Sequence, residues 1–182
     1  LGGAQAIAML AYGGKSFLPC EVIVGPGNKW VTAAKLLVSA DVKIDMLAGP
    51  SELVLVADGS ARPDLAAADL LAQAEHDIEA SPVLISLDTQ FTQAVNLELT
   101  RQLETLPTAP TAEAALDKGF AVNVDSLEQA AQLADRLAPE HLQLSLLNAP
   151  QARLLFSCYG AIFVGERSGE VLGDYGAGPN HV

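Results

Sequence analysis

The chain alternates between short apolar runs and longer stretches with helical spacing, and these patterns predict strands and helices in turn. The run LVLVA at residues 53–57 is continuously apolar, which is typical of a strand buried on both faces of a parallel sheet. Comparable runs recur along the chain. The pattern predicts strands at residues 21–24, 42–46, 53–57, 82–87, 120–124, 142–146 and 161–164.

Helices are predicted between most of these strands, and two of them have clear start signals. Arg62-Pro63-Asp64 is a good helix start, since proline is tolerated in the first turn and an acid suits the helix dipole. Ser126 with Gln129 three residues later forms a capping box. The pattern predicts helices at residues 4–12, 29–39, 64–77, 89–106, 113–118, 126–137 and 150–156, with a loop (TAPT) at residues 108–111.

The helix predicted at residues 64–77 has an apolar stripe and a polar end. The stripe comprises Leu65, Ala68 and Ala72, with Leu70 and Leu71 to one side. Near its end, Gln73 and His76 are three residues apart, which places an amide oxygen and an imidazole on one helix face. Two such neighbours are a usual way to begin a zinc site, although an amide ligand is uncommon. The alternative is a surface helix that ends in a polar patch.

Strands that alternate with helices roughly every 20 residues predict an α/β fold with a largely parallel sheet. The length of 182 residues allows one large domain or two small ones. In open parallel sheets, ligands gather where strands end and helices begin. We therefore expect the polar clusters of the sequence to lie at that edge.

Composition narrows the classes of function. Half the residues are apolar and 18% are charged, which is globular composition. The 22 acidic and 10 basic residues give a formal charge of -12, which repels a phosphate backbone and argues against a nucleic-acid partner. No run of about 18 apolar residues predicts a membrane span. Cys20 and Cys158 are far apart, which fits a reducing compartment better than a disulfide framework.

The ends of the sequence indicate a piece of a longer protein. The chain begins at Leu1 with neither an initiator methionine nor a signal peptide, and it stops at Val182 directly after a glycine-rich loop.

All three histidines have an acid nearby, which favours a functional site over isolated solvated side chains. His76 stands between two acids, Glu140 precedes His141, and His181 follows Asp174 by seven residues. At a junction between helix and strand, Glu140 and His141 can do separate work, because an imidazole transfers protons at neutral pH and a partly buried carboxylate activates water. The alternative there is a loop with two solvated charges.

The segment Gly25-Pro26-Gly27-Asn28 follows a strand and opens a helix, where backbone N–H groups could meet a phosphate. It is a poor dinucleotide fingerprint, because Trp30 stands where the third glycine would be and the proline removes a donor. The segment is a turn motif that a cofactor could touch.

Six motifs in one order carry a resemblance to a known family. They are GGAQAIA (2–8), VGPGNKWVTAAK (24–35), IDMLAGPSELVLVAD (44–58), DLLAQAEHD (69–77), APEHL (138–142) and GDYGAGPNHV (173–182). In this combination the chain resembles histidinol dehydrogenase over its whole length. The resemblance implies zinc-dependent oxidation of L-histidinol to L-histidine through an aldehyde, with reduction of two NAD⁺, as the last step of histidine biosynthesis.

The resemblance also implies roles for individual residues. Glu140 and His141 match the acid/base pair, in which His141 takes protons in the hydride-transfer steps and Glu140 activates the water that attacks the aldehyde. The zinc ligands implied are Gln73, His76 and Asp174; the substrate contacts are Ser51, Gln73, His76, His141, Asp174 and His181; the NAD⁺ contacts are Gln5 and Asn28.

The family organisation implies two incomplete Rossmann-like units with largely parallel sheets. Residues 1–52 would finish an NAD-contacting domain, and residues 53–182 would carry the zinc and catalytic residues. A fourth zinc ligand and a substrate-binding glutamate would lie beyond Val182, in a tail supplied by the partner subunit of a homodimer. We therefore expect the chain alone to be inactive, and the full enzyme to be cytoplasmic, or plastidial in a plant.

Two other readings remain open. A relative in the same family could oxidise another small alcohol, such as a sulfonated diol, with similar zinc and acid/base residues. Alternatively, the chain could be a non-catalytic nucleotide-binding or assembly module. A metal hydrolase is disfavoured, since nothing resembles HExxH.

Overall fold

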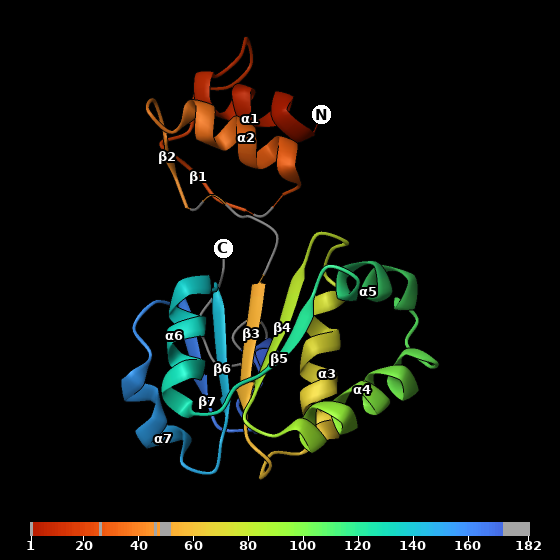
Figure 1. Cartoon of the computed structure of the whole chain (residues 1–182). Coiled ribbons are helices and arrows are strands. Elements are labelled where there is room, and N and C mark those ends of the chain that lie inside the picture. The colour runs from red at the N-terminus through yellow and green to blue at the C-terminus, as the bar shows by residue number, and fades with distance from the viewer. Residues whose placement is uncertain (1, 26, 46, 48–51, 173–182) are drawn as a thin grey trace. The chain divides into compact units, whose positions relative to one another are not determined.

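The computed structural model of the chain describes residues 2–25, 27–45, 47 and 52–172. These residues form two compact units, which divide between residues 47 and 52 (Figure 1). All pairings between the named strands are parallel. The predicted α/β fold with parallel sheets is therefore confirmed. Within the described ranges, no helix is long and apolar enough to cross a membrane.

The first unit is small and has two helices beside a two-stranded sheet. Its elements are α1 (Gly3–Tyr12), β1 (Val22–Ile23), α2 (Lys29–Val38) and β2 (Lys43–Ile44). Its core consists of Ile7, Ala11, Ile23, Val38 and Val42. Apolar residues of both helices thus pack together with the short strands, whereas most of α1 outside Ile7 and Ala11 is not buried.

A buried lysine joins the segments that follow the two strands of this unit. Lys35, only 3% exposed, donates from Nζ to the carbonyl oxygen of Gly25 at 2.9 Å and forms an ion pair with Asp45. The other carboxylate oxygen of Asp45 accepts from the backbone N–H of Gly25 at 2.9 Å. The start of the GPGN segment is therefore held from both sides by paired charges, which a buried charge requires.

The second unit is a five-stranded parallel sheet with helices on both faces (Figure 1). The strand order is β5-β4-β3-β6-β7, so the chain runs outward from β3 to β5 and then crosses to the other side of β3. The elements are β3 (Glu52–Ala57), α3 (Pro63–Ala74), β4 (Ser81–Ser86), α4 (Thr89–Leu103), α5 (Ala109–Leu116), β5 (Phe120–Asn123), α6 (Leu127–Leu137), β6 (His141–Ser145), α7 (Ala149–Ala152), a 3₁₀ turn (Arg153–Leu155) and β7 (Ala161–Val164).

The alternation of side chains along β3 explains why its sequence is continuously apolar. Leu53, Leu55 and Ala57 pack with apolar residues of α3 and α4 on one face of the sheet. Val54 and Val56 pack on the other face with the small residues of α6. Both faces are covered along residues 53–57, so only Glu52, at the exposed start of the strand, is polar.

The sequence pattern places the apolar face of α3 and the ends of two helices incorrectly. The buried face of α3 consists of Ala66, Ala67, Leu70, Leu71 and Ala74, whereas Leu65 and Ala72 are partly exposed and Ala68 is exposed. The helix ends at Ala74, earlier than predicted. The helix α5 already begins at Ala109, inside the predicted TAPT loop, because Pro110 is tolerated in the first helical turn.

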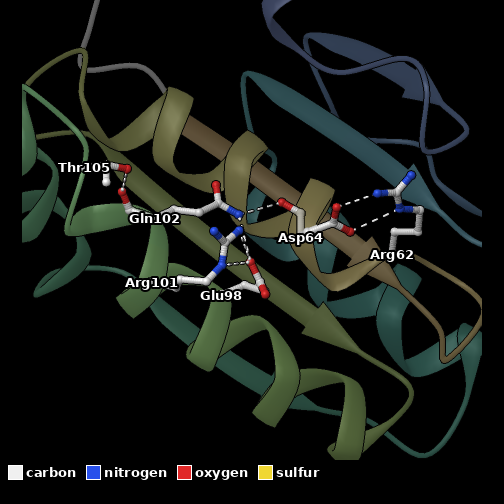
Figure 2. Close-up of polar contacts among 6 residues, drawn as sticks. All are labelled: Arg62, Asp64, Glu98, Arg101, Gln102 and Thr105. Carbon is white, nitrogen blue, oxygen red and sulfur yellow. Dashed lines mark hydrogen bonds and ion pairs between the residues drawn. The ribbon is translucent and has the colours of Figure 1, made fainter.

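Polar contacts hold the start of α3 against the end of α4 (Figure 2). As predicted, Pro63 lies in the first turn of α3 with Asp64, and Arg62 donates to Asp64 at 3.1 and 2.5 Å. Gln102 on α4 donates to the backbone carbonyl of Asp64 at 2.9 Å and to Glu98 at 3.3 Å. These contacts position the helix that carries Gln73.

Candidate functional site

His141 is the first residue of β6 and is almost completely buried, with 2% of its surface exposed. Its ring Nδ1 lies 3.1 Å from Oε1 of Glu170, a residue that is 3% exposed. The ring also meets Phe163 of β7 edge-on, with 5.8 Å between the ring centres. A strand, an aromatic ring and a carboxylate therefore surround this imidazole.

The carboxylate that meets His141 belongs to a larger buried polar cluster. Gln143 lies two residues along β6, on the same sheet face, and its Oε1 accepts from the backbone N–H of Glu170 at 3.3 Å. Its Nε2 donates to Oδ2 of Asp69 on α3 at 2.5 Å. A Cβ atom at Gly169 would lie 2.9 Å from Asp69 Oδ1, so the glycine lets the backbone approach α3 closely. We call Asp69, His141, Gln143 and Glu170 the His141 cluster.

Burial raises the pKa of Asp69 above its ordinary value of 3.8. The hydrogen bond from Gln143 lowers this pKa in part, and the nearby charge of Glu170 raises it further. A raised carboxyl pKa means that the folded protein binds this proton more tightly than the unfolded chain does. The stabilisation from protonated Asp69 is complete below 3.8 and is lost as pH rises through the pKa of the folded state.

We therefore expect Asp69→Asn to remove the loss of stability that follows ionisation of Asp69 as pH rises. The asparagine oxygen can still accept from Gln143 but does not titrate. Urea denaturation at a series of pH values should show that the wild type loses free energy of unfolding relative to the variant as pH rises above 3.8. The slope is at most about 1.4 kcal/mol per pH unit, the limit for one proton. A difference that is constant, or that grows with pH in favour of the wild type, would contradict this assignment.

Gln73 lies on the same side of α3 as Asp69 and is completely buried. It is four helical residues beyond Asp69, about 6 Å along an axis that runs against the strands. His141 precedes Gln143 by two strand residues, a similar distance of about 6.6 Å. Because Asp69 contacts Gln143, this register brings Gln73 level with His141, at the amino edge of the sheet.

The side-chain amide of Gln73 has no hydrogen-bond partner among the described residues, at either its oxygen or its nitrogen. Each buried polar group left in this state costs about 1–3 kcal/mol. Such a cost is expected where a ligand or ion completes the environment. The amide oxygen is suited to a cation, so Gln73 fits the predicted role of zinc ligand.

His76 does not share a helix face with Gln73, because α3 ends at Ala74 and His76 lies in the following turn. Its side chain is exposed, and Nδ1 lies 2.6 Å from the carbonyl oxygen of Ala72. A carbonyl only accepts, so Nδ1 carries the proton and Nε2 carries the lone pair. Histidines that bind metals commonly make this kind of bond through the other ring nitrogen, and His76 therefore also fits a zinc ligand.

The third predicted ligand, Asp174, lies outside the described residues, as do the predicted substrate contacts Ser51 and His181. Within the described part of the chain, no three His, Cys, Asp or Glu side chains gather in a group that could hold a metal ion. The zinc site remains a prediction based on Gln73 and His76.

The candidate residues lie at the opposite edge of the sheet from the one we expected. Gln73 is at the carboxyl end of α3 and His141 begins β6, so both belong to the amino edge of the parallel strands. At the carboxyl edge, between β3 and β6, Asp58 accepts from the backbone N–H groups of Ser60 at 2.9 Å and Leu147 at 3.0 Å. Doubly wound sheets usually bind ligands at this position, but here the carboxylate of Asp58 is hydrogen-bonded to its own loops.

The remaining predicted residues are distributed between the two units. Glu140 directly precedes β6 and is partly exposed, beside the buried His141. Gln5 is exposed on α1. Asn28 caps α2, because its Oδ1 accepts from the backbone N–H groups of Trp30 at 3.1 Å and Val31 at 3.2 Å. The NAD⁺ contacts of Gln5 and Asn28 stay predictions.

Comparison with known proteins decides the family. The sequence profile described as histidinol dehydrogenase matches residues 1–182. The chain belongs to the histidinol dehydrogenase family. It is 54% identical to the histidinol dehydrogenase of Moorella thermoacetica and 52% identical to that of Thermus thermophilus, in both cases over 100% of this chain. The chain spans 43% and 44% of those two relatives, which is less than half of their length.

Solved structures agree with the family and with the fold. The crystal structure of histidinol dehydrogenase from Elizabethkingia anophelis is 38% identical, with a TM-score of 0.94 over 99% of this chain and 42% of that chain. A γ-glutamyl phosphate reductase from Thermotoga maritima, at 11% identity, has a TM-score of 0.52 over 90% of this chain and 45% of that chain. This second likeness shows a shared fold alone.

The sequence analysis did not identify three members of the His141 cluster, namely Asp69, Gln143 and Glu170. Of these, only Asp69 lies within one of the motifs shared with the histidinol dehydrogenase family. Asp69 lies one turn before Gln73, within DLLAQAEHD. Gln143 is a polar residue in the otherwise apolar strand HLQLS, on the His141 face. That interruption is a usable signal, since a buried strand carries a polar side chain only where a partner exists. Glu170 gives no comparable signal in its loop.

Proposed function

We propose that the chain is part of an enzyme that oxidises L-histidinol to L-histidine through the aldehyde, in histidine biosynthesis. The family membership of the chain supports this proposal, and one observation carries it: the buried His141 follows Glu140 on the sheet face that α3 covers, level with the unpartnered Gln73. A proton acceptor, an acid and a polar helix end therefore meet at one sheet edge, which suits oxidation of a small polar alcohol.

The proposed reaction consists of two oxidations separated by the addition of water. The alcohol loses two electrons and two protons to become the aldehyde, water adds to the aldehyde carbon, and the resulting hydrate loses two more electrons to become the acid. In total, one alcohol, one water and two NAD⁺ give one carboxylate, two NADH and three protons. NAD⁺, when bound, accepts a hydride in each oxidation.

The residues of this chain supply the proton transfers. His141 accepts the hydroxyl proton in each oxidation, because burial beside Glu170 leaves Nε2 as the ring nitrogen that faces away from the carboxylate. Glu140, partly exposed at the same strand end, activates the water that attacks the aldehyde. Separating these roles between neighbouring side chains lets one site perform both oxidations.

Gln73, His76 and Asp174 are proposed as zinc ligands from this chain. The buried amide of Gln73 and the Nδ1–H bond of His76 to Ala72 support the first two. Zinc, when bound, would mainly position the amino alcohol and polarise its oxygen. The proposed substrate contacts are Ser51, Gln73, His76, His141, Asp174 and His181, and the proposed NAD⁺ contacts are Gln5 and Asn28.

We infer a full-length enzyme with two Rossmann-like domains that works as a homodimer. Residues 1–52 would belong to the domain that contacts NAD⁺, and residues 53–182 to the domain with the zinc and catalytic residues. The fourth zinc ligand and a substrate glutamate would come from residues beyond Val182, so the chain alone would not turn over substrate. Two cysteines far apart in the sequence suit a reducing cytoplasm.

The proposal is tested by NADH production from the full-length enzyme with different alcohols. We expect two NADH per L-histidinol consumed, measured by absorbance and by chromatography of the acid product. A sulfonated diol serves as the competing substrate. Faster turnover of the diol would mean that the enzyme oxidises a different alcohol. If neither substrate led to NADH, the proposed oxidation would be refuted.

A further inference from the structure

The partner of the His141 ring is a carboxylate that is buried as deeply as the ring itself. Glu170 is 3% exposed and His141 is 2% exposed, and Oε1 of the acid lies 3.1 Å from Nδ1 of the ring. A buried carboxylate is strongly unfavourable unless it is paired or hydrogen-bonded. Its other oxygen, Oε2, has no hydrogen-bond partner among the described residues, so the contact with the ring is the main described compensation.

The backbone around Glu170 is held in place by contacts separate from the carboxylate. The backbone N–H of Glu170 donates to Oε1 of Gln143 at 3.3 Å, and Gln143 is itself bound to Asp69 at 2.5 Å. The preceding Gly169 approaches Asp69 so closely that a side chain there would collide with it. The carboxylate is thus directed at His141 from an anchored backbone.

Nδ1 and Oε1 lie at ion-pair distance, but they are not aligned as a hydrogen bond in the structure. Hydrogen bonds in active sites are often poorly aligned without substrate and tighten when it binds. Because an ionised carboxylate only accepts, tightening this contact makes Nδ1 the donor and leaves the lone pair of the neutral ring on Nε2. We propose that Glu170 is a positioning residue that holds His141 in the Nδ1–H tautomer, with Nε2 as the proton acceptor. The role rests on the proposed dehydrogenase function.

In each oxidation, the hydroxyl proton of the substrate passes through His141 to solvent. The substrate hydroxyl gives its proton to Nε2, and both ring nitrogens are then protonated. The carboxylate of Glu170 stays ionised and faces the positive ring. The proton then leaves Nε2 for solvent, which restores the starting tautomer. The edge contact with Phe163 at 5.8 Å restricts rotation of the ring during the cycle.

The test is Glu170→Met in the full-length enzyme, with Glu166→Met as the matched control. Methionine keeps the side-chain length but accepts no comparable hydrogen bond. Partners that orient metal-bound imidazoles are typically worth about 10–100-fold in activity. We expect a similar fall in kcat with L-histidinol, while KM and zinc content stay near the wild type. Glu166, partly exposed in the same segment, should leave kcat unchanged.

Nitrogen NMR of ¹⁵N-histidine-labelled enzyme at a pH where the ring is neutral gives a readout that packing alone would not move. His141, identified by its missing signal in His141→Asn, should be the Nδ1–H tautomer in the wild type and shift toward Nε2–H in Glu170→Met. An Nε2–H ring in the wild type, an unchanged kcat, or a loss of kcat with an unchanged tautomer would each overturn the proposal. The wild-type tautomer decides alone if the methionine variant does not fold. If the wild type oxidises no histidinol, the proposed function fails, but the tautomer measurement still tests the contact.

Discussion

His141→Asn is expected to lower kcat for L-histidinol oxidation by about 10²–10⁴-fold in the full-length enzyme, the range for loss of a general base. Asparagine places an N–H near the position of Nδ1 and can still donate to Glu170, whereas it has no atom at the position of Nε2. The variant therefore removes the proposed proton acceptor without leaving the buried carboxylate unpaired. Steady-state NADH production measures the effect, and KM should change little.

Glu140→Gln separates the two roles in the same assay. We expect it to slow oxidation of the aldehyde more than oxidation of the alcohol, because only the aldehyde must first add water. Gln151→Asn, on the exposed surface of α7, is the control for substitution at a distance. His141→Asn with a kcat within about threefold of the wild type would remove the imidazole from the mechanism.

The fold could be predicted from the sequence because the central strands β3, β4 and β6 have both faces covered. The continuous run of β3 needs apolar partners from α3 and α4 on one side and from α6 on the other, and a polar residue would be costly in either place. The helix start signals at Pro63 and Ser126 were correct for similarly local reasons. Pro63 lies in the first turn of α3, and Ser126 Oγ accepts from the backbone N–H of Gln129 at 3.3 Å.

The face and the end of α3 could not be predicted, because eight of its twelve residues are alanine or leucine. Such a composition allows several apolar stripes, and hydrophobic spacing alone does not choose among them. Tertiary packing chose the stripe with Leu70 and Leu71, which face α4, α5 and the sheet. The helix then stops at Ala74, which leaves His76 in the next turn.

The candidate site was predictable only where residue chemistry is visible in a short motif. Glu140-His141 attracts attention as an acid and a base at a strand start. The cluster that holds His141 depends on contacts over long sequence separations: Gln143 and Asp69 are 74 residues apart, and Glu170 lies 27 residues beyond Gln143. No local pattern encodes such pairings, since they arise from the register between α3 and β6. The amino-edge location was missed for the same reason.

Gln73→Met is expected to weaken zinc binding by at least about 100-fold in the full-length enzyme while leaving the zinc-free protein as stable as the wild type or more so. The amide of Gln73 is completely buried without a partner among the described residues. Its removal should therefore raise the free energy of unfolding of the zinc-free protein by up to about 1–3 kcal/mol. Zinc affinity is measured by chelator competition, and stability by urea denaturation of the zinc-free protein.

Gln143→Met is the matched control, because Gln143 is just as completely buried but has partners on both sides of its amide. Its loss leaves Asp69 and the backbone of Glu170 unpaired, so the zinc-free protein should be destabilised by about 1–3 kcal/mol. Equal zinc content in Gln73→Met, His76→Ala and the wild type would eliminate the metal site. Equal destabilisation by the two methionine variants would mean that Gln73 has a structural partner of its own. As a metal ligand, Gln73 should destabilise the zinc-free protein, because its amide oxygen has lost its hydrogen bond to water and has no cation in its place.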